Sequence, residues 1–230
     1  MIRLFVSDEL RLNTPISLSE SHIHYLKNVM RRQPGDDILL FNGRDGEWQS
    51  TLKTLDKKQG TCLPHTQTRQ QGTTQKRYLC PALIKKENMD WVLQKATELG
   101  VSDIFPILSE RTVVSKLNLE RAQLLVTEAA EQCERLSVPT IHTPHKIGDV
   151  LDELSPDTTP ICLSERGTTT APLSAGKTYA FFVGPEGGWT PTELDLFARK
   201  NVSFWHLGHT ILRAETASVA ALSCACFCLD

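Results

Sequence analysis

The sequence predicts an α/β fold in which a small β domain precedes a larger domain built on a parallel sheet. Residues 1–70 contain short strand-like runs and one helical pattern. Residues 66–77 are polar and lack apolar periodicity, which is typical of a linker. From Tyr78 onward strand-like and helical segments alternate, the pattern of a parallel sheet covered by helices. We therefore expect two domains, 1–70 and 71–230.

In the first domain, Ser19–Met30 has the spacing of a helix that Ser19 can cap. Pro34-Gly35-Asp36 and Asn42-Gly43 are typical turns. The strand-like runs are Arg3–Val6, Ile38–Phe41 and Glu47–Leu55.

In the second domain, Asn88 is expected to cap the first helix and Gly100 to end it. Pro81 lacks an N–H group, so its strand is expected at an edge or with a bulge. The expected strands are 78–84, 101–108, 140–142, 160–163, 179–183 and 202–207, and the further helices are 119–136, 150–154, one starting at 190 and 216–229.

Composition restricts the classes of function. The 230 residues are 40% hydrophobic and carry a net charge of −2, so nucleic-acid binding would depend on local cations rather than on global charge. Seven cysteines without a signal peptide favour a reduced, cytoplasmic protein. Cys224, Cys226 and Cys228 do not share one helical face, so we expect no metal site. The apolar tail is too short and too interrupted for a membrane span.

The most informative stretch begins with the strand-like run 179–183, which ends at Gly184-Pro185-Glu186-Gly187-Gly188. Three glycines in five residues let a ligand approach the backbone closely. Thr190, Pro191 and Glu193 then form the pattern of a capped helix start. Strand, glycine loop and helix together indicate a ligand site at the carboxyl end of a parallel strand. The loop lacks the Gly-Lys-Ser/Thr ending of a phosphate-binding loop.

A second glycine-broken segment, LGHTILRAETA at 207–217, follows a short strand, and the two segments suggest one shared pocket. Other motifs accompany them in order: Arg3, VMR at 29–31, Gly35-Asp36, Met89-Asp90-Trp91, QKATELG at 94–100, SER at 109–111 and EAAEQ at 128–132. With these motifs, nearly the whole chain resembles the RsmE-like family of ribosomal RNA methyltransferases in the SPOUT superfamily.

The resemblance implies a PUA-like β barrel, a C-terminal SPOUT domain with a trefoil knot, and a homodimer. It also implies methyl transfer from S-adenosylmethionine to N3 of a uridine in small-subunit (16S) ribosomal RNA. The donor-binding residues that it implies are Leu163, Val183, Gly184, Pro185, Glu186, Gly187, Gly188, Leu207, Gly208, Ile211, Leu212 and Arg213.

Uridine N3 carries a proton, so the site must remove it or stabilise the resulting anion. Arg213 is the candidate for charge stabilisation, and Glu215 or Glu186 could accept the proton or orient Arg213. A structural ion pair between Arg213 and Glu215 is the alternative. The candidate RNA contacts are Arg3, Arg31, Arg32, Arg111 and Arg135.

The sequence departs from the family pattern at Thr210, where an arginine is usual, and at Glu134, where a glycine is usual. Two other functions stay open. One is methyl transfer to a ribose 2′-OH or to transfer RNA. The other is a SPOUT-fold ribosome-assembly protein that binds RNA without catalysis, which failure to bind the donor would indicate.

Overall fold

The computed structural model describes residues 1–73, 75–165, 167 and 173–229. It divides into two compact units, each of which is described here by itself. The first contains residues 1–73 and 130–138, and the second contains 74–129 and 139–230. No pattern in the sequence predicts that 130–138 belongs to the first unit.

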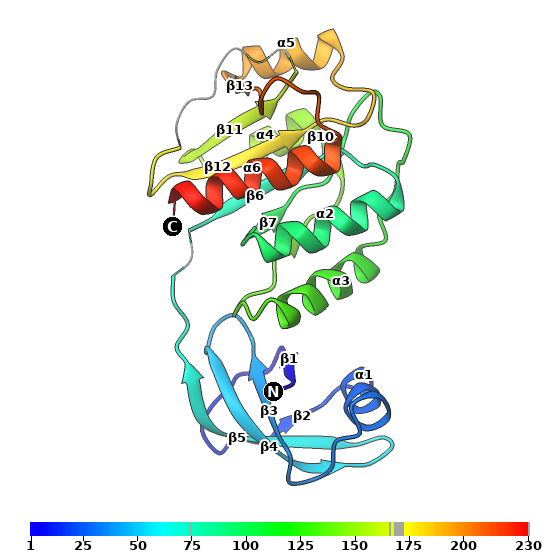
Figure 1. Cartoon of the computed structure of the whole chain (residues 1–230), viewed down its shortest axis with the longest axis vertical. Coiled ribbons are helices and arrows are strands. Elements are labelled where there is room, and N and C mark those ends of the chain that lie inside the picture. Colours follow the sequence, from blue (N-terminus) through cyan, green and yellow to red (C-terminus); the bar gives the residue numbers. More distant parts are fainter. Residues whose placement is uncertain (74, 166, 168–172, 230) are drawn as a thin grey trace. The chain divides into compact units, whose positions relative to one another are not determined.

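The first unit is built on a five-stranded sheet with the order β1-β3-β4-β5-β2 (Figure 1). Only the β1–β3 pair is parallel. The core contains Leu4, Ile38, Leu40 and Leu52 from alternate strand positions, and each is at most 2% exposed. The strands are β1 (Arg3–Phe5), β2 (Ile16–Ser17), β3 (Asp37–Phe41), β4 (Glu47–Leu55) and β5 (Gly60–Arg69).

The predicted helix at 19–30 is two elements. Ser19 caps α1 (Glu20–His24) as expected, since its side chain accepts a hydrogen bond from the N–H of His22. The chain then continues as a π-helix, η1 (Tyr25–Val29), in which the N–H of Met30 donates to the carbonyl of Tyr25, five residues back.

The second unit contains a six-stranded sheet with the order β13-β11-β12-β6-β7-β9, and all of its pairs are parallel. The strands are β6 (Arg77–Pro81), β7 (Asp103–Ile104), β9 (Thr140–Ile141), β11 (Thr158–Leu163), β12 (Thr178–Val183) and β13 (Ser203–Trp205). A small parallel pair joins β8 (Ile107–Leu108) to β10 (His145–Lys146).

Helices cover both faces of this sheet (Figure 1). They are α2 (Lys86–Glu98), α3 (Leu119–Gln132), α4 (Ile147–Glu153), α5 (Pro191–Arg199) and α6 (Ala214–Leu229). On one face α6 contacts β6, β12 and α2. On the other, Val150 of α4 and Phe197 of α5 form a core with Cys80 and Phe182. Both faces are therefore buried, which explains the continuous apolar run in β12.

The last segment leaves β13 at the edge of the sheet and returns across its middle as α6, a path that a knotted chain end requires. The predicted fold class is confirmed: an α/β fold in which a parallel sheet follows a small β unit along the sequence.

Three local predictions are wrong. The predicted linker 66–77 is too long, because pairing with β4 keeps the polar residues 66–69 in β5, and Arg77 already belongs to β6. The strand at 101–108 is interrupted between β7 and β8 at Phe105-Pro106. Asn88 does not cap α2, which begins at Lys86.

The fourth wrong prediction concerns Pro81, which ends an interior strand rather than an edge strand. The N–H of Ala82 donates to Val183 in β12, and the N–H of Leu83 donates to Ile107 on the opposite side. Because successive residues alternate in direction, the missing N–H of Pro81 faces the side where β7 has ended. On that side the N–H of Phe105 donates to Leu79 and the N–H of Leu83 donates to Ile107, so the missing N–H of Pro81 coincides with the break between β7 and β8.

Candidate active site

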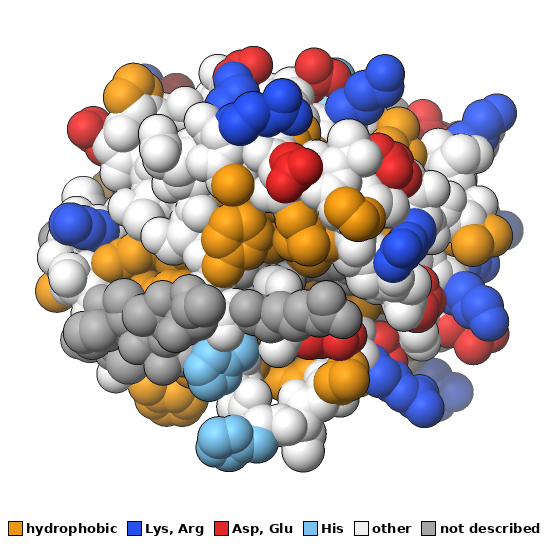
Figure 2. Space-filling view, turned by 90° about the horizontal axis from the view of Figure 1, so that it is seen from above, with side chains coloured by type: hydrophobic (Ala, Val, Ile, Leu, Met, Phe, Trp, Pro, Cys, Tyr) orange, Lys and Arg blue, Asp and Glu red, His pale blue; other side chains and the backbone are white. Residues whose placement is uncertain are grey.

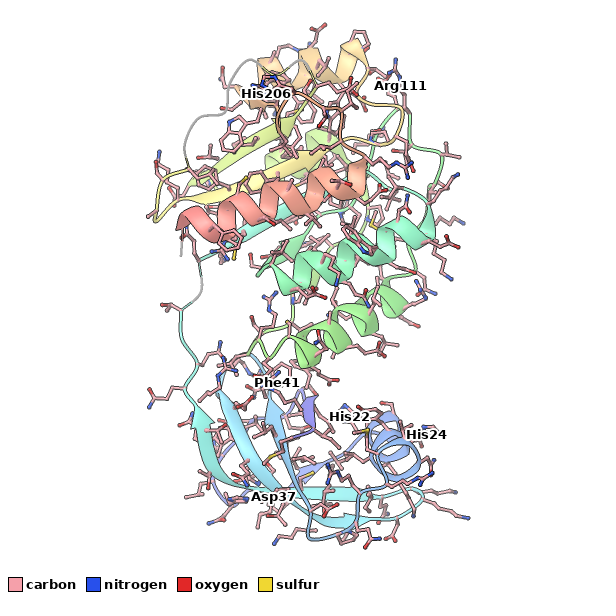
Figure 3. All side chains as sticks on the ribbon, in the orientation of Figure 1. His22, His24, Asp37, Phe41, Arg111 and His206 are labelled. Carbon is pink, nitrogen blue, oxygen red and sulfur yellow. The ribbon has the colours of Figure 1, made fainter. Side chains whose placement is uncertain are left out.

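A cavity of about 750 Å³ lies at the carboxyl ends of β11, β12 and β13, entirely within the second unit. Leu163, Val183 and Trp205, the last residues of these three strands, line it. The first residues of α2 and α6 also line it. This is the edge at which parallel sheets bind ligands, and the volume suits a small molecule. Figure 3 labels two residues of its wall, Arg111 and His206.

The glycine loop after β12 has a conformation that depends on its glycines. The N–H of Gly188 donates to the carbonyl of Pro185 at 2.9 Å, and Gly188 has a φ of 66°. A Cβ on Gly184 would lie 3.1 Å from the indole ring of Trp189. The loop is therefore a closed turn with Trp189 packed against its first residue.

The helix start after this loop is confirmed in detail. Thr190 caps α5, Pro191 is its first residue, and Thr190 and Glu193 form the reciprocal capping box. Glu193 is 5% exposed, and its second carboxylate oxygen accepts a hydrogen bond from the N–H of Glu110 at 2.9 Å. The capping box thus also contacts a loop far away in the sequence.

The segment after β13 forms the opposite wall. Gly208 has a φ of 105°, and the carbonyl of Trp205 accepts a hydrogen bond from the N–H of Ser164 at 2.9 Å. Ile211 is 74% exposed, although it also lines the cavity. All twelve predicted donor-binding residues, from Leu163 to Arg213, line this one cavity.

The predicted catalytic residues also line the cavity, but they are not paired with each other. The Arg213 side chain is exposed, and its guanidinium makes no hydrogen bond or ion pair with a described residue. Glu186 is exposed on the glycine loop. Glu215 has one carboxylate oxygen, Oε2, that is buried without a partner among the described residues. The alternative of a structural Arg213–Glu215 ion pair is therefore absent from the described part of the chain.

The predicted RNA-binding arginines have different environments. Arg31 is exposed, with a φ of 52°, and Arg32 lies 3.8 Å from Asp36. Arg135 donates to the hydroxyl of Ser137 at 3.1 Å. Arg111 is exposed and donates to the carbonyl of Gly187 at 2.7 Å.

Arg3 differs from the other four, because it is only 7% exposed. Its Nε donates to Glu47 at 2.6 Å, and its other nitrogens donate to the carbonyls of Ala130, Glu131 and Arg135 at 3.1–3.2 Å. These carbonyls lie at and just beyond the end of α3, where a positive charge is favourable. Its guanidinium is thus engaged within the protein, and we do not retain Arg3 as a candidate RNA contact.

Some residues of the site have no signal in the sequence. Lys85 and Asn88 line the cavity from the start of α2. The indole N–H of Trp189 donates to the carbonyl of Leu163 at 2.8 Å and joins the loop after β12 to the end of β11. Cys162 lies beside this edge, but burial and the negative charge of Glu193 raise the pKa of its thiol and disfavour the thiolate form that a nucleophile needs.

Within the described residues, no three His, Cys, Asp or Glu side chains are grouped as metal ligands would be. Among the helices that the structure describes, none combines the length and apolar character that crossing a bilayer requires. On the face shown in Figure 2, Lys and Arg side chains are mixed with Asp and Glu around the rim. Any nucleic-acid contact on that face must therefore depend on individual cations.

Comparison with known proteins adds independent evidence. The family described as "RNA methyltransferase domain" matches residues 72–225, and the one described as "RNA methyltransferase PUA domain" matches residues 18–64. The ribosomal RNA small subunit methyltransferase E of Rickettsia conorii is 32% identical, over 96% of this chain and 93% of its own. That of Bacillus subtilis is 29% identical, over 90% and 88%.

A solved structure shows the same architecture. The ribosomal RNA small subunit methyltransferase E of Neisseria gonorrhoeae, bound to S-adenosyl methionine, matches with a TM-score of 0.89. It is 30% identical, and the match covers 97% of this chain and 95% of that one. The cavity, its two glycine loops and the two matched domains lead to the same result: the chain belongs to the family of the ribosomal RNA small subunit methyltransferases E.

Proposed function

We propose that this protein transfers a methyl group from S-adenosylmethionine to N3 of a uridine in small-subunit ribosomal RNA. The observation that carries the proposal is the cavity at the ends of β11, β12 and β13, which all of the predicted donor-binding residues line, in a chain of this family. S-adenosylmethionine supplies an activated methyl group on a positively charged sulfur. The task of the protein is to position that group against the acceptor.

The residues of the cavity fit such a donor. Gly188 and Gly208 have positive φ values, and a Cβ on either would meet no atom within 4 Å, so open space lies beside their backbone. The buried Oε2 of Glu215 lacks a partner among the described residues, and a ligand that carries positive charge would satisfy it. The donor has both a sulfonium and an amino group.

The acceptor nitrogen must lose its proton before or during the transfer. Arg213 is exposed, lines the cavity and has no ion pair with a described residue, so its guanidinium is available to stabilise negative charge on the uracil ring. Glu215 or Glu186 would accept the proton. These three roles are proposals, which variants at each position would test.

The substrate must offer an unpaired or extruded uridine, because N3 is hydrogen-bonded inside a duplex. We propose that the predicted N-terminal domain, residues 1–70, contributes Arg31 and Arg32 to RNA binding, and that Arg135 adds a further contact.

Thr210 lines the cavity at the place where the resemblance implies an arginine. The cavity would therefore carry one positive charge fewer than it would with that arginine. That change would affect RNA affinity or rate rather than the class of reaction.

We also propose that the protein is a homodimer in which a second copy covers part of α6. This helix has apolar residues around most of its circumference, and Phe227 is 86% exposed. Sedimentation velocity of the wild-type protein and of Phe227→Glu would test the proposal, and a monomeric wild type would contradict it.

Because the substrate belongs to the ribosome, we expect the protein to act in the cytoplasm.

The decisive experiment uses S-adenosylmethionine labelled in its methyl group. The protein is incubated with assembled small subunits, and separately with naked ribosomal RNA, both from cells that lack the modification. Labelled N3-methyluridine at one position would establish the reaction, and label on a ribose 2′-OH or in transfer RNA would favour the other enzymatic function. Absence of donor binding in calorimetry would overturn the proposal and favour an assembly protein.

A further inference from the structure

The motif Ser109-Glu110-Arg111 forms a turn that contacts the glycine loop, and the proposed function does not use this contact. The N–H of Thr112 donates to the carbonyl of Ser109 at 3.1 Å, and the hydroxyls of these two residues lie 3.0 Å apart. Ser109 is 9% exposed. The turn 109–112 is therefore closed by its own hydrogen bonds, and it holds the Arg111 side chain and the Glu110 N–H in fixed positions.

Arg111 contacts the glycine loop directly. Its Nη1 donates to the carbonyl of Gly187 at 2.7 Å, with a longer contact of 3.4 Å to the carbonyl of Trp189. A Cβ on Gly187 would lie only 3.2 Å from Cβ and 3.3 Å from Cδ of Arg111. The stem of the arginine thus lies against Gly187, and a Cβ at this position would push the stem aside.

The peptide that Arg111 holds is the one that closes the loop. Its carbonyl, on Gly187, accepts from Arg111, and its N–H, on Gly188, donates to the carbonyl of Pro185. Both ends of one planar peptide are therefore restrained. Losing the Arg111 bond would free the Gly187–Gly188 peptide to rotate, since glycine has the widest conformational freedom.

Glu193 makes a second connection between the same two segments. One carboxylate oxygen accepts from the N–H of Glu110 at 2.9 Å, and the other accepts from the N–H of Thr190 at 2.8 Å. The side chain is buried, so both bonds are shielded from water. The turn 109–112 is consequently attached to both ends of the stretch 187–190.

We propose that Arg111 is a positioning residue which, together with Glu193, holds the glycine loop in the conformation that binds S-adenosylmethionine. This inference rests on the proposed function, because it requires that the donor binds beside this loop. It replaces the prediction that Arg111 contacts the RNA backbone. The two roles differ in a measurable way: a positioning residue affects donor binding without RNA, whereas a backbone contact affects RNA binding and its salt dependence.

The first test measures donor affinity by calorimetry without RNA, and RNA affinity over a range of salt concentrations. Arg111→Ala is expected to weaken donor binding about tenfold or more, through loss of a charge-assisted hydrogen bond, and to leave the salt slope of RNA binding unchanged. Arg31→Ala, which removes an exposed arginine of the first unit, is the matched variant. It is expected to reduce the salt slope and leave donor affinity unchanged.

A second variant removes the connection without changing any positive charge. Glu193→Gln keeps the size of the side chain but replaces one acceptor oxygen by a donor, so that one of the two backbone N–H groups loses its partner. We expect it to weaken donor binding as Arg111→Ala does, and the double variant to lose less than the product of the two single losses. Circular dichroism and thermal unfolding would verify that each variant is folded.

The possible results separate the two hypotheses. If wild type binds the donor and Arg111→Ala binds it equally well, the positioning role is overturned and the proposed function stands. A reduced salt slope in Arg111→Ala would favour the RNA contact in its place. If wild type itself binds no donor, the proposed function fails, and this inference fails with it.

Discussion

The indole N–H of Trp189 donates to the main-chain carbonyl of Leu163 at 2.8 Å, and this bond joins the glycine loop after β12 to the end of the neighbouring strand β11. The same ring packs against Gly184 and makes an edge contact with Phe197, with the ring centroids 5.1 Å apart. One side chain thus fixes the glycine loop relative to both β11 and α5. The shape of the cavity depends on this contact.

Trp189→Phe keeps the aromatic packing and removes the hydrogen bond. We expect the free energy of unfolding to fall by about 1–2 kcal/mol, because the Leu163 carbonyl loses its partner, and donor affinity to fall several-fold. Urea unfolding and calorimetry would measure the two effects. Trp91→Phe is the control, since Trp91 is 41% exposed and does not line the cavity. Equal donor affinity in wild type and Trp189→Phe would contradict the prediction.

Arg213→Ala tests the proposed stabilisation of charge. Loss of one such donor is expected to lower the rate of methyl transfer by roughly 10²–10³-fold, while the free energy of unfolding changes by less than about 0.5 kcal/mol, since the side chain is exposed. Transfer of labelled methyl groups under single-turnover conditions would measure the rate. Arg199→Ala, on the exposed side of α5, is the matched control. Full activity in Arg213→Ala would end this proposal.

Arg3→Ala is expected to destabilise the first unit. The Arg3–Glu47 pair is buried, with side chains only 4% and 5% exposed, and loss of Arg3 would leave the Glu47 carboxylate with only the partly exposed Arg69, 4.0 Å away, as a cationic partner, at a cost of about 3–5 kcal/mol. Arg11→Ala, which removes an exposed pair with Glu9, should cost less than about 1 kcal/mol. Urea unfolding would compare them. A loss of RNA affinity in Arg3→Ala without destabilisation would restore Arg3 as an RNA contact.

Glu134→Gly is expected to stabilise the protein. Glu134 has a φ of 60°, in the left-handed region where a side chain costs about 1–2 kcal/mol and glycine does not. This finding explains why a glycine is usual at this place in the pattern that the sequence resembles. Glycine also loses more entropy on folding, so we expect a net gain of about 1 kcal/mol or less, measured by thermal unfolding. Asn201→Gly, at a φ of 56°, should gain less, because asparagine tolerates this region. If Glu134→Gly raises the stability no more than Asn201→Gly does, the proposed backbone strain at Glu134 is refuted.

Stability is expected to fall in alkaline solution. Burial raises the pKa of the Cys62 thiol to about 12, whereas an unfolded cysteine titrates near 8.5. Above about pH 8.5 the unfolded chain releases a proton that the folded chain keeps, so the free energy of unfolding declines towards pH 12, by up to about 1.4 kcal/mol per pH unit for one group. Urea unfolding at pH 8 and pH 10 should show a shallower decline in Cys62→Ala. Identical slopes would show that this thiol titrates alike in both states.

Local patterns predicted much of this structure. The capping box at Thr190 and Glu193 and the cap at Ser19 were predictable because their partners lie within three residues. The strand Glu47–Leu55 has the predicted bounds, since β propensity and two flanking turns act locally. The glycine loop was recognisable because three glycines in five residues allow backbone conformations that other residues rarely adopt, such as the positive φ of Gly188.

Other features depend on partners that no local pattern reveals. The π-helix, the interior position of Pro81 and the extension of β5 to Arg69 all follow from which segments lie next to them in the folded chain. The same holds for the site. The sequence predicted residues that the structure brings together around one cavity, but it did not show that Trp189 contacts the end of β11 or that Lys85 and Asn88 complete the wall.

The sequence by itself determined the class of fold, the family and many of the residues around the cavity, because short motifs in a fixed order along the chain encode them. Only the tertiary structure decided what the arginine side chains contact. Arg3 is buried against Glu47, 44 residues away, and Arg111 contacts Gly187, 76 residues away. Whether a guanidinium faces solvent or a backbone carbonyl depends on burial and geometry, which residue type and local spacing do not specify.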